Sequence, residues 1–254
     1  MSFGWLTAHP IAHRGLHDGA ARIENSLGAA RAAIEAGYAI ECDVQLSRDG
    51  QAIVFHDATL ERLTSHHGRL ADYDAAQLTQ ILLKSGETIP TIQQLLSLID
   101  GRVPLVCEIK SAFDGDLRLA RRVAQAAALY QGPLALESFD PAVMAFLRAK
   151  QSALRINHVA LGIVAQAHYD RPEDEWAHLP LQERQHLAEL SHLNETNPDF
   201  LSWNLRDLPH STPHLWRNGL RRPLTIWTVR SPQDQAKALT FADQIVFEGF
   251  RPQA

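Results

Sequence analysis

The sequence is poor in cysteine, has no excess of positive charge and lacks a long apolar run. Its two cysteines, Cys42 and Cys107, exclude a disulfide-stapled scaffold and fit a reducing compartment. Lys plus Arg number 24 against 29 for Asp plus Glu, and the net charge of −5 argues against a basic nucleic-acid-binding protein. No run approaches the ~18 apolar residues that span a bilayer, and the N-terminus does not resemble a secretory leader. We therefore expect a cytoplasmic protein with no membrane span and no nucleic-acid partner.

The chain does contain a regular alternation of short apolar runs and helical stretches. Hydrophobic residues make up 45% and charged residues 21%, as in a globular protein with a sizeable core. Helical stretches such as Ser26–Ala36, Asp116–Tyr130 and Pro141–Lys150 separate the apolar runs, which predicts a parallel sheet covered by helices. Eight such units in roughly 250 residues favour a closed (β/α)8 TIM barrel. The predicted strands are Ala8–His13, Ala39–Leu46, Pro104–Ile109, Leu134–Ser138, His158–Ile163, Phe200–Asn204, Leu224–Val229 and Gln244–Glu248.

Two longer segments interrupt this alternation. One follows the second strand and its hairpin, and the other is the polar stretch Ala165–Pro198. We expect a single barrel domain over residues 1–254 with a small insertion at about residues 57–95. Such insertions form lids or substrate loops in many barrels, but they can also be solvated excursions without a role. The sequence leaves both alternatives open for each segment.

The second predicted strand carries two acidic residues, Glu41 and Asp43. Alternate residues of a strand share one face, so these two carboxylates point the same way. Both faces of a barrel strand are largely buried, and two buried carboxylates are costly unless a positive charge joins them. Hard oxygen ligands of this kind suit Mg²⁺ or Ca²⁺. Taken alone, the pattern also fits an exposed strand with paired surface charges.

The third predicted strand strengthens the metal hypothesis. Glu108 and Lys110 share one face near its C-terminal end, where barrel enzymes carry their active sites. Glu108 can complete a site of three carboxylates, and Lys110 can supply a cation for an anionic substrate. The alternative for Lys110 is a simple salt bridge to Glu108.

Two histidines follow predicted strands at the same end of the barrel. Asp49-Gly50 predicts a two-residue hairpin turn, and that register would place His56 opposite Asp43. The first strand ends in His13-Arg14-Gly15, where Arg14 suits a bidentate grip on phosphate. Histidines act as acid and base near neutral pH, and a metal with nearby cations stabilises charge at phosphorus. Together these residues predict phosphodiester cleavage.

At this point the sequence resembles the glycerophosphodiester phosphodiesterase family over nearly its whole length. The matching stretches, in order, are His13-Arg14-Gly15, Glu24-Asn25-Ser26, Glu41-Cys42-Asp43-Val44, Asp49-Gly50, Phe55-His56-Asp57, Leu60-Glu61-Arg62-Leu63-Thr64, Ile89-Pro90-Thr91, Glu108-Ile109-Lys110, Ser138-Phe139-Asp140 and Trp227-Thr228-Val229. The resemblance implies a barrel that hydrolyses small-molecule glycerophosphodiesters to glycerol 3-phosphate and an alcohol.

The resemblance also implies roles for individual residues. His13 and His56 look like the acid–base pair, and Arg14 and Lys110 like the phosphate-binding cations. Trp227 is expected in the wall on the glycerol side, with a core aromatic as the alternative. The implied ligands of a divalent cation, Mg²⁺ or Ca²⁺, are Glu41, Asp43 and Glu108.

Two positions stay open within this resemblance. The family commonly ends its last strand with Thr-Asp followed by Pro, whereas this chain has Phe247-Glu248 and reaches Pro252 later, so the contribution of the last strand is undecided. Glu137, before Ser138, is a further candidate at the rim for contact with metal-bound water or with substrate.

Two other functions fit the same residues. A lysophospholipase D would use this site on lysophospholipids, but it needs an apolar channel that the polar Ala165–Pro198 does not suggest. A non-catalytic phosphodiester-binding barrel is also possible because fold alone does not imply activity. The sequence does not decide the alcohol group, the choice of metal, the role of each histidine or the oligomeric state. It also does not decide whether water attacks phosphorus directly or a cyclic phosphate forms first.

Overall fold

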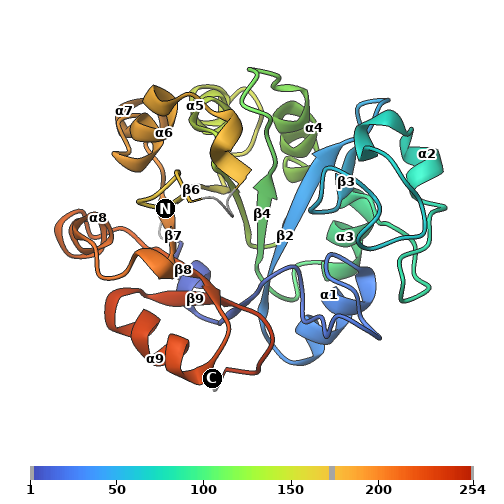
Figure 1. Ribbon diagram of the computed structural model, residues 1–254, viewed down its shortest axis with the longest axis horizontal. Helices are drawn as coiled ribbons and strands as arrows, with labels where there is room; N and C mark the ends of the chain where they lie inside the picture. The colour runs from blue at the N-terminus through green and yellow to red at the C-terminus, as the bar shows by residue number, and fades with distance from the viewer. Residues whose placement is uncertain (1–2, 172–174, 253–254) are drawn as a thin grey trace.

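Eight parallel strands form a closed ring in the computed structural model, which describes residues 3–171 and 175–252 (Figure 1). Each barrel strand pairs with its neighbours, and β1 closes the ring by pairing with both β2 and β9. The ninth strand, β3, lies antiparallel on β2 outside the ring. The strands are β1 Ile11–Ala12, β2 Ala39–Leu46, β3 Ala52–Val54, β4 Leu105–Ile109, β5 Leu134–Ser138, β6 Ala160–Ala165, β7 Phe200–Asn204, β8 Leu224–Val229 and β9 Gln244–Phe247.

The predicted barrel is confirmed, and most strand bounds are close to the predicted ones. The first strand is shorter than predicted, at Ile11–Ala12, and the predicted strand His158–Ile163 is shifted, because β6 begins at Ala160 and ends at Ala165. The shift follows from pairing, because Gly162 to Ala165 lie beside β7 and need ladder partners there. The last strand ends at Phe247, so Glu248 lies immediately beyond it.

Helices cover the outside of the ring, and their ends follow ordinary capping rules. Ser26 caps α1 by accepting a hydrogen bond from the backbone N–H of Ala29, and Asp140 caps α5 at Pro141. None of the described helices is long and apolar enough to cross a membrane. The α-helices are α1 Leu27–Glu35, α2 Ala75–Leu78, α3 Ile92–Ile99, α4 Arg118–Ala127, α5 Pro141–Lys150, α6 Leu181–Ala188, α7 Leu193–Thr196, α8 Ser211–His214 and α9 Pro232–Phe241. Shorter helical turns are η1 Gly4–Thr7, η2 Leu70–Asp72, η3 Glu175–His178, η4 Leu205–Asp207 and η5 Leu215–Gly219.

The two faces of each barrel strand carry different residues, and this difference places the site. On β2, Ile40, Cys42 and Val44 pack outward under the helices. Inward-facing Ala39 belongs to a second apolar cluster that closes the lower end of the barrel, together with Leu6, Ile11, Val106, Ala135, Ala160, Phe200 and Val246. Above this apolar floor the inward positions of β2, β4 and β5 are acidic, so the polar site lies toward the C-terminal ends of the strands.

The β2–β3 hairpin corrects the predicted register. Val44 pairs with Val54 and Leu46 with Ala52, one position away from the pairing that a two-residue turn at Asp49-Gly50 would give. The loop is longer because the N–H of Ser47 donates to the carbonyl of Gln51, with Gly50 in the left-handed region. Phe55, not His56, therefore follows in the position opposite Asp43, and its N–H donates to the Asp43 carbonyl over 3.0 Å.

The segment between β3 and α3 forms a small core of its own. Its buried residues pack with Ile23, Ile53 and Phe55, and they are Leu60, Leu63, Leu70, Ala75, Leu78, Ile81, Leu83 and Ile89. In Figure 1 this segment, with α2, lies outside the ring of barrel helices, to which α3 belongs. His56 and Asp57 lie at the start of this segment. Its core includes Ile53 and Phe55 and so anchors the end of β3 that leads to them.

Candidate active site

Three buried carboxylates meet inside the barrel mouth. Glu41 and Asp43 come from β2 and Glu108 from β4, where Asp43 and Glu108 are neighbours in register. One oxygen atom of each residue lies within 4.8 Å of the others. The alternation of a strand and the pairing of its neighbour thus bring together the three residues that the sequence nominated as metal ligands.

Two cations and the side-chain amide of Asn25 surround the Asp43 carboxylate. The Lys110 Nζ lies 2.8 Å from Asp43 Oδ1 and 2.7 Å from Glu108 Oε1, so Lys110 joins two carboxylates rather than pairing with Glu108 alone. The Arg14 Nε lies 3.3 Å from Asp43 Oδ2, and Asn25 Nδ2 donates to that oxygen over 2.9 Å. Burial opposes ionisation of Asp43, but Lys110 and other nearby positive charges outweigh it and hold its pKa well below the usual range.

Glu41 is less well neutralised than Asp43. Its Oε2 accepts a hydrogen bond from the Arg14 N–H over 2.9 Å, whereas its Oε1 has no hydrogen-bond partner among the described residues. Burial, reinforced by Asp43 and Glu108, raises the pKa of Glu41 well above its ordinary value. A free buried oxygen in a cluster of hard donors fits a divalent cation, whose charge would keep Glu41 ionised.

His13 is oriented by a residue from the opposite end of the chain. Its Nδ1 lies 2.5 Å from Glu248 Oε2, and the Nε of Arg230 donates to the other oxygen of Glu248 over 2.7 Å. The His13 Nε2 then faces the carboxylates, 3.9 Å from Glu41 Oε2. Burial lowers the pKa of His13, with Arg14 acting in the same direction and Glu248 against it.

His56 is held in a similar way by its neighbour in sequence. Its Nδ1 lies 2.8 Å from Asp57 Oδ1, and Arg62 donates to both oxygens of Asp57. Gln45 Nε2 donates to the His56 carbonyl over 2.7 Å and so holds the backbone in place. Although the hairpin register was wrong, His56 still faces the site, because the chain leaves β3 at Val54 and turns toward the mouth.

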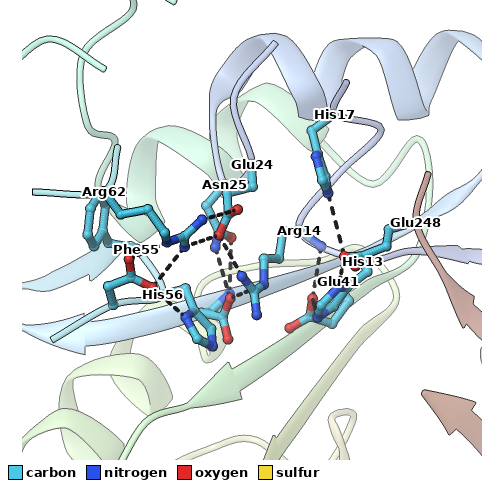
Figure 2. A network of polar contacts seen from close by, with 12 residues as sticks. His13, Arg14, His17, Glu24, Asn25, Glu41, Phe55, His56, Arg62 and Glu248 are labelled. Carbon is cyan, nitrogen blue, oxygen red and sulfur yellow. Dashed lines mark hydrogen bonds and ion pairs between the residues drawn. The ribbon is translucent and has the colours of Figure 1, made fainter. Parts of the chain in front are cut away.

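Arg14 lies between the two histidine groups. Its Nη1 donates to Glu24 Oε1 over 2.6 Å, and Glu24 also accepts from Arg62 (Figure 2). Arg14 and Asn25 have φ values of 57° and 58°, in the left-handed region that few residues other than glycine adopt. The Asn25 N–H donates to the Arg14 carbonyl over 2.8 Å. Strained backbone at both residues accompanies their contacts with Asp43, as is common at functional sites.

The site opens into two adjoining cavities. The inner cavity, of about 180 Å³, is lined by predicted site residues that include His13, His56 and Trp227. The outer cavity, of about 340 Å³, has His56, Lys110 and Trp227 in common with it. An aromatic cluster lines the outer cavity, in which Phe139 and Trp176 have ring centroids 4.6 Å apart and Phe139 and Trp227 5.5 Å. Trp227 is partly buried against the floor of the barrel and still reaches both cavities.

The structure adds residues to which the sequence analysis gave no role. Glu248 orients His13, and Asn25 and Glu24 connect Arg14 to the rest of the network. Asp57 and Arg62 lie in quoted stretches of the sequence, and the direct adjacency of Asp57 to His56 was a usable signal. Glu248 lies at the end of the last strand, whose contribution the sequence left undecided, because its contact with His13 spans nearly the whole chain.

Comparisons with known proteins agree with this geometry. Residues 13–242 match the model of the glycerophosphoryl diester phosphodiesterase family. A glycerophosphodiester phosphodiesterase of Caldanaerobacter subterraneus subsp. tengcongensis is 37% identical over 110 residues, which cover 40% of this chain and 44% of that protein. The chain therefore matches less than half of the length of that curated relative.

Solved structures resemble the chain over almost its full length. A phosphodiesterase of Oleispira antarctica, solved in complex with the product sn-glycerol-3-phosphate, has a TM-score of 0.77 at 22% identity and covers 98% of this chain and 95% of its own. A glycerophosphodiester phosphodiesterase from Thermotoga maritima has a TM-score of 0.69 at 21% identity, with 93% and 92% covered. At these identities the likeness shows that the fold is the same.

Proposed function

Because the chain belongs to the glycerophosphoryl diester phosphodiesterase family, we propose that it hydrolyses glycerophosphodiesters to glycerol 3-phosphate and an alcohol. The observation that carries this proposal is the placement of two histidines beside one carboxylate cluster. Each histidine has its Nδ1 tied to a carboxylate, His13 to Glu248 and His56 to Asp57. The Nε2 atoms are then left for proton transfer at the mouth.

The histidines transfer protons, and the cations bind the phosphate. One histidine takes a proton from the attacking group, which is either water or a hydroxyl of the glycerol itself. The second route gives a cyclic phosphate, which water must then open to release glycerol 3-phosphate. The new P–O bond forms as the bond to the departing alcohol breaks, and the other histidine donates a proton to that leaving oxygen. Arg14 and Lys110 lie at the rim of the inner cavity and bind the phosphate oxygens.

Glu41, Asp43 and Glu108 would hold Mg²⁺ or Ca²⁺, because they offer hard oxygen donors within one small volume. The free Oε1 of Glu41 supports this assignment. When bound, the cation supplies positive charge where the phosphate oxygens gain negative charge. We place the activity in a reducing compartment such as the cytoplasm, which fits the free, buried Cys42 and Cys107.

A panel of glycerophosphodiesters tests the proposal. Purified protein is incubated with glycerophosphocholine, glycerophosphoethanolamine and glycerophosphoglycerol, with Mg²⁺, with Ca²⁺ and with neither, and glycerol 3-phosphate is measured enzymatically. We expect release that needs a divalent cation and that His13→Ala and His56→Ala remove. If wild-type protein and both variants bind the diesters equally and release no product, the barrel is a binding protein.

The aromatic outer cavity favours one second candidate, a lysophospholipase D activity. Trp176 comes from the polar segment 165–198, yet its ring packs against Phe139 and Phe113 beside the site. This apolar wall supplies a surface that the sequence of the segment did not suggest. Turnover of lysophosphatidylcholine compared with glycerophosphocholine decides between the two activities.

A further inference from the structure

One buried carboxyl group in the site belongs neither to the metal cluster nor to either histidine group. Glu137, on β5, is 3% exposed and lies in register between Glu108 on β4 and Gly162 on β6. Within residues 3–171 and 175–252, its Oε2 has no hydrogen-bond partner. The group of oxygens within 4.8 Å of one another consists of Glu41, Asp43 and Glu108 and does not include Glu137.

Neighbouring side chains fill the barrel on one side of Glu137, and the inner cavity lies on the other. The ring of Phe200 occupies the space that a side chain at Gly162 would take, so the barrel interior is filled at that level. On the side of β7, the Trp227 indole Nε1 donates to the Ser202 carbonyl over 3.1 Å. Glu137, Ser202 and Trp227 all line the inner cavity.

The size and chemistry of this inner cavity fit a small polyol. Its volume of about 180 Å³ holds roughly six groups the size of a water molecule, so it admits a small group such as glycerol and excludes a large one. A buried oxygen without a partner is costly, and a hydroxyl donor relieves that cost. Trp227 offers an apolar surface to the carbon chain, as in many sites with a few placed polar groups.

We propose that Glu137, supported by Ser202, recognises the free hydroxyl groups of the glycerol arm and thereby sets the preference for glycerophosphodiesters. The inference rests on the proposed function and deepens it. The glycerol hydroxyls donate to Glu137, and the Ser202 hydroxyl completes the polar wall. The departing alcohol then lies toward the aromatic outer cavity. Glu137 is a specificity-determining residue in this account and takes no part in proton transfer at phosphorus.

Two esters with the same leaving group test the inference. One is the p-nitrophenyl ester of sn-glycerol 3-phosphate, and the other is propyl p-nitrophenyl phosphate, which lacks both free hydroxyls. In Glu137→Ala we expect kcat/KM on the glycerol ester to fall about 10- to 100-fold, the range for leaving a buried hydrogen-bonding group without its partner. The propyl ester should change by less than about twofold. Glu137→Gln keeps an acceptor and should recover part of the loss, and Ser202→Ala should show the smaller effect.

An equal fall on both esters would overturn the inference, because a residue that supports the metal or the fold affects both. An unchanged preference for the glycerol ester would overturn it as well. Calorimetry of sn-glycerol 3-phosphate and propyl phosphate, both in Ca²⁺, keeps the test separate from activity. We expect wild type to bind glycerol 3-phosphate more tightly and Glu137→Ala to lose that difference. If wild type hydrolyses neither ester, the proposed function fails; if it hydrolyses only the glycerol ester, a glycerol hydroxyl is the attacking group. In both cases the binding difference decides the role of Glu137.

Discussion

The two sides of the site build the same arrangement in different ways. On one side His13 contacts Glu248 (Figure 2), which contacts Arg230; on the other His56 contacts Asp57, which contacts Arg62. The His56 side is local, because His56 and Asp57 are adjacent in sequence. The His13 side exists only because β1 and β9 meet when the barrel closes. The same chemistry therefore depends on a short motif on one side and on closure of the fold on the other.

The two sides also differ in how far their contacts extend. Arg62 contacts Glu24 as well as Asp57, and Glu24 contacts Arg14, so the His56 side continues to Arg14. Glu248 instead has several partners of its own, since His17 Nε2 lies 3.7 Å from the same oxygen that contacts His13. We therefore expect the His13 side to depend on Glu248 alone and the His56 side on a network.

Removal of either histidine should have the largest effect. His13→Ala and His56→Ala should each lower kcat by about 10²- to 10⁴-fold, the usual contribution of general acid–base catalysis. The double variant should lose little more than the worse single variant, because both act in one transition state. His66→Ala, at an exposed position, is the control. A kcat within threefold of wild type for either variant would remove that side from the reaction.

Neutralising the two carboxylate partners should have the next largest effect and compare the sides directly. Glu248→Gln and Asp57→Asn should each lower kcat by about 10- to 100-fold, because the histidine loses the partner that sets its tautomer and orientation. Glu248→Gln should be the more severe, since it also leaves His17 and Arg230 without an anion. Steady-state kinetics with glycerophosphocholine measures both. If KM alone rises, these residues bind substrate instead.

The two arginines should differ more than the two carboxylates. Arg62→Gln should lower kcat/KM several-fold, because Arg62 makes short contacts with both Asp57 and Glu24. Arg230→Gln should change it less than about twofold, because the Arg230 side chain is 61% exposed and exposed ion pairs contribute little. Equal effects of the two variants would show that the network on the His56 side carries no function.

Stability against acid should show the smallest effect. Burial opposes ionisation of Glu248, but His13 and His17 outweigh it and hold its pKa well below the usual range. A depressed folded pKa adds stability above the unfolded value, about 4.3 for Glu, and that stability is lost as pH falls through the folded pKa. Glu248→Gln should thus cost about 1 kcal/mol at pH 7 and less at pH 3 in urea titrations. A cost that does not change with pH would mean that packing, not charge, holds this side.

Most of the fold could be predicted from the sequence, because strand and helix patterns are local. The predicted bounds of β2, β5, β7 and β8 match the structure. The boundaries of β6 could not be predicted, because residues 159–165 form one apolar run and only pairing with β7 decides where its ladder begins. The hairpin register failed because hydrogen bonds of Ser47 extend the loop by a residue.

Some features of the site likewise follow from local sequence, and others depend on the folded chain. The positions of Glu41, Asp43 and Glu108 follow from strand alternation and from the rule that barrel sites lie at strand ends. The role of Lys110 as a bridge between two carboxylates depends on side-chain reach, and Glu248 meets His13 across 235 positions of sequence. Such contacts form only when the barrel folds and closes, and no local sequence pattern predicts them.

We propose that Glu41, Asp43 and Glu108 would hold one divalent cation and that hydrolysis requires it. The most direct test is the rate of glycerol 3-phosphate release from glycerophosphocholine by wild-type protein stripped with EDTA and then titrated with Mg²⁺ or Ca²⁺. We predict no release from stripped protein, saturable recovery with added cation, and no recovery in Glu108→Gln at the same concentrations. Full activity that survives EDTA would contradict the claim.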